Sequence, residues 1–254
     1  MAHLQGTPCR SAKTGARPER VWRAVGLLVA AATGIFAVGL VVGFVIVGRH
    51  GGGPIQGWDD TVGRWYLRHR SPLVGISEVV ATYLDAFPLA VICVVLTAIL
   101  AFALRSMRAL VPIVAYLGGE FEVLIIREVI LRPRPPTADY PAPGAIKAIH
   151  ETSYSFPSGH SVAVTAVLFA LLGTIAATYR IWWPWLIALV ASLFVIGTRL
   201  VLGVHWFSDV TFGLLFGIAW GVTVARITRQ VEWADFIAII RPHAKRTLDH
   251  PASG

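Results

Sequence analysis

A histidine and an aspartate four residues apart, His205 and Asp209, have the clearest chemical potential in this 254-residue sequence. If the chain is helical from Val204 onward, their side chains lie one turn apart on one helix face. The carboxylate then accepts a hydrogen bond from one imidazole nitrogen and leaves the other nitrogen available as a nucleophile or base. Arg199, six residues before His205, adds a positive charge to this segment.

A second histidine, His160, follows directly after Pro157, Ser158 and Gly159. We expect a helix to begin here. The first turn of a helix has free backbone N–H groups and the positive end of the helix dipole, which together suit an anion. Ser158 adds a hydroxyl group, and Gly159 lets a ligand approach the backbone closely.

A third polar segment, residues 127–135, contains two arginines seven residues apart, Arg127 and Arg134. If this segment is helical, the two arginines lie about two turns apart on one helix face. Arginines near a helix start and two histidines indicate a phosphate site beside a nucleophile. Arg132 has two interpretations at this point. Glu128, four residues before it, favours a helix-end ion pair, and the position also suits a substrate contact.

These segments resemble the three motifs of the type-2 phosphatidic acid phosphatase family. That family includes undecaprenyl-diphosphate phosphatases and vanadium haloperoxidases. Its second motif, Pro-Ser-Gly-His, is present at Pro157–His160. Its third, Arg, five residues, His, three residues, Asp, is present as Arg199, His205 and Asp209, with Thr198 where serine is common.

The first family motif, Lys, six residues, Arg-Pro, is altered at one position. Arg127 replaces the lysine ahead of Arg134 and Pro135. Arginine keeps the positive charge, but it is larger and planar. If the lysine of the family motif supplies only charge, Arg127 can take its place. If the motif needs a compact ammonium group, Arg127 changes the geometry of the phosphate site.

The resemblance implies a mechanism. His205 attacks phosphorus and becomes a phosphohistidine, Asp209 orients it, and His160 protonates the leaving oxygen and then activates water. The phosphoryl oxygens would be held by Arg127, Arg134, Ser158, Gly159 and Arg199, with Arg132 a possible substrate contact. The resemblance implies no cofactor and no metal, since arginines supply the positive charge.

The elements that must position these residues are membrane helices. The chain is 56% hydrophobic and 14% charged, with a mean hydropathy of +0.67. This excludes a disordered chain and most soluble enzymes. Cys9 in a polar tail and Cys93 in an apolar run predict no disulfide. The net charge of +8 follows from basic residues flanking the spans, so we expect no nucleic-acid partner.

We predict an all-α, polytopic membrane protein with six transmembrane helices in a bundle. The apolar runs are Ala24–Val47, Phe87–Leu104, Ala109–Leu131, Ser161–Thr178, Trp182–Thr198 and Val210–Ala225. The first run is too long for the apolar core of a signal peptide. The helix of the second run is expected to begin before the run itself, near Val74. Residues 1–23 form a basic tail, 24–226 the catalytic membrane domain and 227–254 a second tail, with a membrane-touching patch at Phe236–Ile240.

Charge asymmetry predicts the orientation. Of the 22 Lys and Arg residues, 13 lie on the side of the termini, and four of the other nine are site residues. We therefore expect cytoplasmic termini, a plasma-membrane location and an active site on the non-cytoplasmic face. Gly51–Pro72, read as a loop, carries Trp58, Trp65 and Tyr66 and suits the membrane interface.

Two acidic residues within the third apolar run, Glu120 and Glu122, are unusual. Because a charge inside a membrane is costly, we expect Glu120 to have a structural partner within the bundle rather than a role with substrate. Three other classes stay open: a transporter, a metal-dependent hydrolase with His160, His205 and Asp209 as ligands, and a haloperoxidase.

The substrate implied by the resemblance is a lipid phosphate in the bilayer. An outward-facing site favours undecaprenyl diphosphate, a carrier lipid of cell-wall synthesis. Phosphatidic acid, phosphatidylglycerol phosphate and other polyprenyl or sugar-lipid phosphates are the alternatives. The composition, rich in Ala, Gly, Val and Arg, suggests a bacterial source. The sequence does not predict an oligomeric state.

Overall fold

A computed structural model describes residues 17–69, 71–104, 106–136 and 153–240. Within these ranges the protein is helical and has no strand. Six helices are long and apolar enough to cross a membrane: Glu19–Val47, Ala86–Ala103, Met107–Ile130, Gly159–Tyr179, Trp183–Leu202 and Phe207–Thr228. The prediction of an all-α, six-span membrane protein is therefore confirmed.

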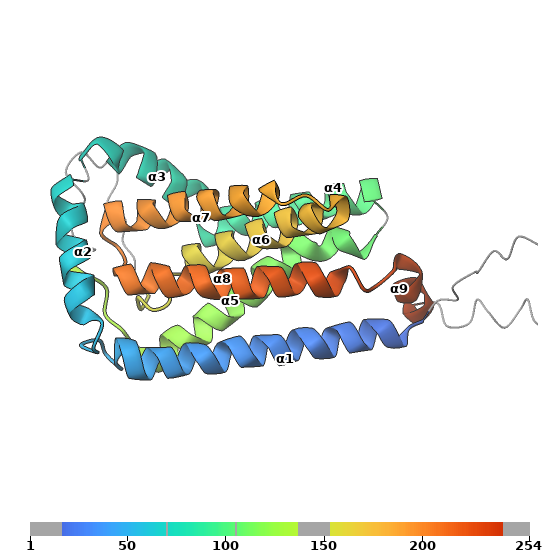
Figure 1. Cartoon of the computed structure of the whole chain (residues 1–254), viewed down its shortest axis with the longest axis horizontal. Coiled ribbons are helices and arrows are strands. Elements are labelled where there is room, and N and C mark those ends of the chain that lie inside the picture. The colour runs from blue at the N-terminus through green and yellow to red at the C-terminus, as the bar shows by residue number, and fades with distance from the viewer. Residues whose placement is uncertain (1–16, 70, 105, 137–152, 241–254) are drawn as a thin grey trace, which may run out of the picture.

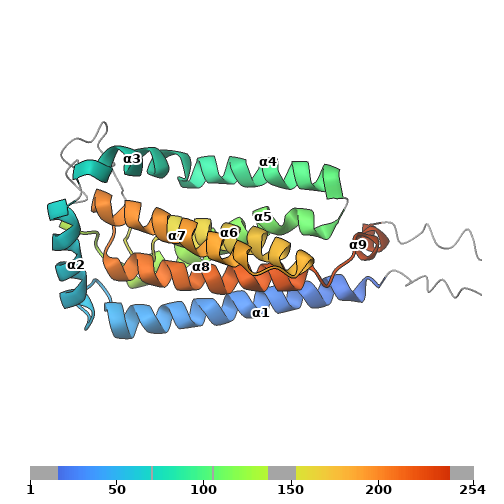
Figure 2. The ribbon, with the colours of Figure 1, turned by 45° about the horizontal axis from the view of Figure 1, so that its top comes forward.

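The spanning helices run along the long axis of the molecule (Figure 1). They are α1 (Glu19–Val42, extended by a π-helical turn at Gly43–Val47), α4 (Ala86–Leu104), α5 (Val111–Ile130), α6 (Gly159–Tyr179), α7 (Trp183–Leu202) and α8 (Phe207–Thr228). In Figure 2, α4 and α1 are the outer rows, with α5 to α8 between them. The central helix α6 packs against α5, α7 and α8.

A row of glycines brings α8 close to α6. A Cβ atom added to Gly217 would lie 2.7 Å from Thr165 Cβ and from the Val162 carbonyl oxygen. Gly213 and Gly221, four residues away on either side, make similarly close approaches to α6. Small residues of this kind let membrane helices pack with their backbones near each other. This packing places the beginning of α6 beside the beginning of α8.

Two shorter helices differ from the sequence-based expectation. The helix expected to continue from Val74 is broken into α3 (Val74–Tyr83) and α4. Pro88, in the first turn of α4, has no N–H to donate to the carbonyl of Leu84, so a helix continuous through Leu84 would lose a hydrogen bond. The segment Gly51–Pro72, expected as a loop, contains α2 (Gln56–His69).

Helices α2 and α9 lie at opposite ends of the bundle. Helix α2 crosses one end, and α9 (Trp233–Ile240) lies at the other, next to the start of α1 (Figure 1). The predicted apolar patch Phe236–Ile240 falls in α9. Cys93 is a free, buried cysteine, whereas Cys9 lies outside the described residues. The division into tails and membrane domain stays a prediction.

Candidate active site

The three polar segments meet at the end of the bundle that α2 crosses (Figure 1). Arg127 is in the last turn of α5, Gly159 begins α6, and His205 lies in the connection between α7 and α8. Segments 70 residues apart in sequence are thereby brought into contact, as shown by the hydrogen bond of 2.8 Å from Arg134 Nη1 to the Val204 carbonyl.

The His205–Asp209 pair forms, but not on a helix face as expected. Helix α8 begins at Phe207, so His205 lies before it. Trp206 has an extended backbone, and its N–H donates to Asp209 Oδ2 at 2.9 Å. Because the Asp209 side chain caps the helix in this way, the helical conformation does not reach Val204. His205 Nδ1 is still 3.5 Å from Asp209 Oδ2, and both side chains are buried.

Both ring nitrogens of His205 have polar neighbours. The Ser155 hydroxyl lies 3.4 Å from Nδ1 and also donates a short hydrogen bond to Asp209 Oδ2. Nε2 lies 3.1 Å from Arg134 Nη1. The imidazole therefore directs Nδ1 to the carboxylate and Nε2 to an arginine. Ser155 was not predicted, since no spacing pattern marks it.

Arg127 and Arg134 do not share a helix face, contrary to expectation. Helix α5 ends at Ile130, and Leu131 adopts a left-handed conformation with φ of 56°. The two arginines converge instead on Ser153, whose Oγ lies 3.4 Å from Arg127 Nη1 and 3.0 Å from Arg134 Nη2. Two cationic side chains therefore face the same polar segment.

Helix α6 begins at Gly159, as the sequence predicted. Ser158 precedes it in an extended conformation, and its buried Oγ has no hydrogen-bond partner among the described residues. A Cβ atom on Gly159 would lie 3.0 Å from Arg127 Nη2. Glycine thus lets the guanidinium approach the helix start. A hydroxyl, backbone N–H groups and a cation meet here, which suits a phosphoryl group.

His160 and His205 border the same small cavity of about 60 Å³. Its polar lining is Asp85, Glu120, Arg127, Gly159, His160 and His205. His160 Nε2 lies 3.4 Å from the Ala81 carbonyl oxygen and 3.7 Å from Asp85 Oδ1. Asp85 was missed by sequence reasoning, because it lies in the break between α3 and α4 that was not expected.

The two glutamates of α5 have different surroundings. Glu120 lines the polar cavity with Arg127 and His160, and the expectation of a structural partner inside the bundle stays a prediction. Glu122 is buried, and its Oε1 has no hydrogen-bond partner in the part of the chain that the structure describes. Arg199 lies in the last turn of α7 and is buried.

Arg132 is fully buried, and neither of its two expected roles holds. Its Nη1 lies 2.7 Å from Asp209 Oδ1, and its Nη2 lies 2.5 Å from Asp59 Oδ2. It therefore forms no helix-end pair with Glu128, and it has no exposed surface for a substrate. Asp59 of α2 was not predicted as a site residue.

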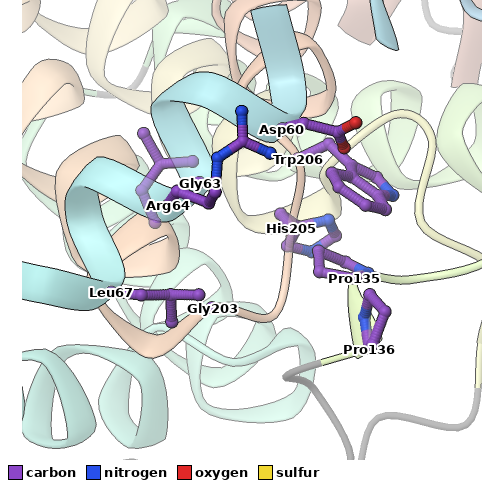
Figure 3. Close-up of a pocket in the computed structure, with 10 residues that line it drawn as sticks. Asp60, Gly63, Arg64, Leu67, Pro135, Pro136, Gly203, His205 and Trp206 are labelled. Atoms are coloured by element: carbon purple, nitrogen blue, oxygen red, sulfur yellow. The ribbon is translucent and has the colours of Figure 1, made fainter. Parts of the chain in front are cut away.

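A second, larger cavity of about 280 Å³ lies on another side of His205. Asp60, Arg64 and Leu67 of α2 line it opposite His205 and Trp206, as Figure 3 shows. Its remaining lining is Pro135, Pro136, Leu200 and Gly203. The nucleophile candidate therefore stands between a polar cavity and a more apolar one.

The described residues bring together no group of three His, Cys, Asp or Glu side chains able to hold a metal ion. His160, His205 and Asp209 therefore do not form the ligand cluster that the metal-dependent alternative requires. Asp209 instead has Arg132, the Trp206 N–H and Ser155 as partners. The metal-independent reaction stays a prediction.

Comparison with a solved structure establishes the class of fold. The crystal structure of a transmembrane PAP2-type phosphatidylglycerolphosphate phosphatase from Bacillus subtilis superposes with a TM-score of 0.61. The match covers 78% of this chain and 94% of that one, at 22% sequence identity. The fold is that of a PAP2-type membrane protein.

The sequence then identifies the family. Residues 108–233, about half of the chain, match the PAP2 superfamily, so the chain belongs to it, as its motifs predicted. An undecaprenyl-diphosphatase of Sulfolobus acidocaldarius is 33% identical over 81 residues. This match covers 32% of the present chain and 35% of the relative, so the chain spans about a third of that relative's length.

Proposed function

We propose that this protein is an integral-membrane lipid phosphatase that hydrolyses a phosphate monoester or diphosphate of a lipid through a phosphohistidine intermediate. One observation carries the proposal. His205 is held between Asp209 at Nδ1 and Arg134 at Nε2, and it borders a polar cavity shared with His160. This arrangement supplies a nucleophile, a second acid–base group and cations for a phosphoryl group.

In the first step the lone pair of His205 Nε2 attacks phosphorus, and the bond from phosphorus to the leaving oxygen breaks. His160 gives its proton to that oxygen. In the second step a water molecule attacks phosphorus, His160 takes a proton from the water, and the P–N bond breaks. Asp209 stabilises the charge that His205 carries between the two steps.

The phosphoryl oxygens would be bound by arginines and by the start of α6. The groups are Arg127, Arg134, Arg199, the Ser158 hydroxyl and the Gly159 N–H. Arginine forks bind phosphate through paired hydrogen bonds, and donors fixed in advance stabilise the charge that develops in the transition state. Because arginines supply this charge, we propose that the reaction needs no metal.

The substrate we favour is undecaprenyl diphosphate. The partial relative of that activity supports it, as does the basic flank of the termini, which favours cytoplasmic termini and an outward-facing site in a bacterial plasma membrane. Phosphatidylglycerol phosphate or phosphatidic acid is the second candidate, because the structural neighbour acts on phosphatidylglycerol phosphate.

A transporter is less consistent with this geometry. Transporter sites lie near the membrane midplane, between broken helices. Here Arg127, His160 and His205 lie at helix ends on one side of the bundle. We therefore favour an enzyme that acts at one membrane face.

The test is release of inorganic phosphate by the purified protein in detergent. Undecaprenyl diphosphate, phosphatidic acid and phosphatidylglycerol phosphate are compared side by side, with and without EDTA, and His205→Ala is the control for contaminating phosphatases. Release that persists in EDTA supports the proposal. No release from any lipid rejects the phosphatase. A tenfold preference for phosphatidic acid, about 1.4 kcal/mol in transition-state binding, rejects only the undecaprenyl assignment.

A further inference from the structure

Three charged side chains form a continuous buried chain behind His205. Asp59, Arg132 and Asp209 each have an exposed fraction of 0%. Arg132 lies between the two carboxylates, 2.5 Å from Asp59 Oδ2 and 2.7 Å from Asp209 Oδ1. These three charged side chains connect α2, the segment after α5 and the first turn of α8, which are far apart in the sequence.

Arg132 is held in one orientation by several acceptors. Its Nη1 also donates to Ser208 Oγ at 2.7 Å, and its Nη2 donates to Gln56 Oε1 at 3.1 Å. The guanidinium carbon lies 5.2 Å from the centre of the Trp206 ring. Each terminal nitrogen therefore contacts one of the two carboxylates and one neutral acceptor.

Asp59 fixes both Arg132 and the beginning of α8. Its Oδ1 accepts the Ser208 backbone N–H at 2.7 Å, and its Oδ2 accepts the Ser208 hydroxyl at 2.7 Å. An N–H of the first helical turn has no partner within its own helix, so a carboxylate there both satisfies it and favours the helix dipole. Asp59 thus anchors the turn that carries Asp209.

The two oxygens of Asp209 have separate partners. Oδ1 accepts from Arg132, and Oδ2 accepts from the Trp206 N–H and Ser155 and faces His205 Nδ1. Rotation of the carboxylate would break the contact with Arg132. Because an unpaired buried charge is strongly unfavourable, the two carboxylates and the guanidinium hold one another in place.

We propose that Asp59 is a positioning residue, which acts through Arg132 to hold Asp209, and hence His205, in the orientation needed for attack on phosphorus. This inference rests on the proposed phosphatase function. Asp59 does not line either of the two cavities that His205 borders, so its effect reaches the nucleophile only through Arg132 and Asp209.

The decisive variant is Asp59→Asn, which keeps the size of the side chain and removes its charge. Asn has one acceptor oxygen and one donor amide group. In either orientation of the introduced side-chain amide, its NH₂ group therefore faces a donor, which is Arg132 Nη2 in one orientation and the Ser208 N–H in the other. We expect kcat to fall about 10- to 100-fold, the scale seen when partners that orient a functional ligand are lost, with KM changed less than about threefold.

The same substitution in an Asp209→Asn background separates positioning from general structure. If Asp59 acts through Asp209, the second loss adds little, less than about threefold, because residues in one network are non-additive. A full multiplication of the two losses overturns the proposal, as does wild-type kcat in Asp59→Asn alone.

Asp235→Asn is the matched control. Asp235 is also a buried aspartate; it accepts the Glu232 N–H at 3.1 Å and has an arginine, Arg20, 3.9 Å away. It lies in α9, at the end of the bundle opposite α2 (Figure 2). We expect it to lower thermal stability and to leave kcat and KM unchanged. An equal fall in kcat for both variants overturns the proposal.

A second variant covers the case in which Asp59→Asn does not fold. Ser208→Ala removes the hydroxyl between Asp59 and Arg132 and keeps both charges. We expect a smaller fall in kcat that again disappears in the Asp209→Asn background. An unchanged kcat, or a fall that persists there, overturns the proposal.

A readout without turnover keeps this inference distinct from the proposed function. Nitrogen-15 NMR of ring-labelled histidine reports the tautomer and hydrogen bonding of His205, which is assigned by loss of its signals in His205→Gln. We expect Asp59→Asn to shift the Nδ1 resonance and Asp235→Asn to leave it unchanged. An inactive wild type rejects the phosphatase, whereas an unshifted resonance in Asp59→Asn rejects the positioning role.

Discussion

The two histidines of the site are held in different ways. His205 is buried, with polar groups at both ring nitrogens and a chain of charges behind it that reaches α2. The His160 side chain is 11% exposed, and it lies 3.7 Å from the carboxylate of Asp85, whose side chain is 62% exposed. His205 is embedded in a network of buried charges, whereas His160 is partly exposed and has an exposed carboxylate beside it.

This difference matches the chemistry proposed for each. A nucleophile must keep one orientation relative to phosphorus, and a fixed carboxylate provides this at the second ring nitrogen. An acid–base group must release a proton to the leaving oxygen and later take one from water, so it needs contact with the cavity. Substitutions at the two histidines and at the residues around them test this division of roles.

His205→Ala should abolish turnover, because it removes the proposed nucleophile. We expect kcat to fall on the order of 10⁴-fold or more, as it does when the nucleophile of a group of cooperating catalytic residues is removed. Phosphate release measures the rate, and quenching in an alkaline denaturant with radiolabelled lipid measures the phosphoenzyme, because a phosphohistidine is stable in alkali and labile in acid. A variant that turns over at the wild-type rate would sink the assignment of the nucleophile.

His160→Ala should lower kcat by about 10²- to 10⁴-fold for a lipid alcohol leaving group. The loss should shrink for an aryl phosphate, because its leaving oxygen needs less protonation. The ratio of the two losses is therefore the measurement. Equal losses for both substrates would show that His160 acts by binding and not as an acid.

Arg132→Met should mainly destabilise the protein. It leaves Asp59 and Asp209 buried without their shared cation, and breaking a buried pair in this way costs about 3–5 kcal/mol. Thermal unfolding in detergent measures the change, with Arg64→Met, which removes an exposed arginine of α2, as the control. Equal melting temperatures for the two variants would contradict the role of the buried chain.

Asp85→Asn should have a small effect. An ion pair with an exposed partner contributes about 0–1 kcal/mol, so kcat should fall by about fivefold at most. The measurement is kcat for the lipid substrate next to that of Asp209→Asn. A loss as large as that of Asp209→Asn would remove the contrast between the two histidines.

Arg127→Lys should have the smallest effect, with activity retained within about threefold, because the ammonium keeps the charge beside Gly159. Lysine cannot reproduce both bonds of Arg127, from Nε to the Pro157 carbonyl at 3.1 Å and from Nη1 to Ser153. Initial rates on the lipid substrate test this. An inactive variant would show that the cavity depends on the arginine fork.

The sequence alone determined the class of fold and the segments that form the site. Apolar runs long enough to cross a bilayer are local properties, so the six spans followed from composition and length. The motif residues at Arg127, Pro157–His160 and Arg199–Asp209 lie next to these runs, and the alternation of the spans placed them on one side. Neither step needs information about packing.

The pairing of the side chains depends on how the helices pack in three dimensions. The start of α8 depends on Asp209 capping Trp206, and the approach of Arg127 to Arg134 depends on Ser153, so helical spacing misplaced both pairs. Asp59 lies 73 residues before Arg132 and 150 before Asp209, in a segment expected as a loop. Contacts between such distant segments arise when helices pack and buried charges must find partners, and no local pattern in the sequence records them.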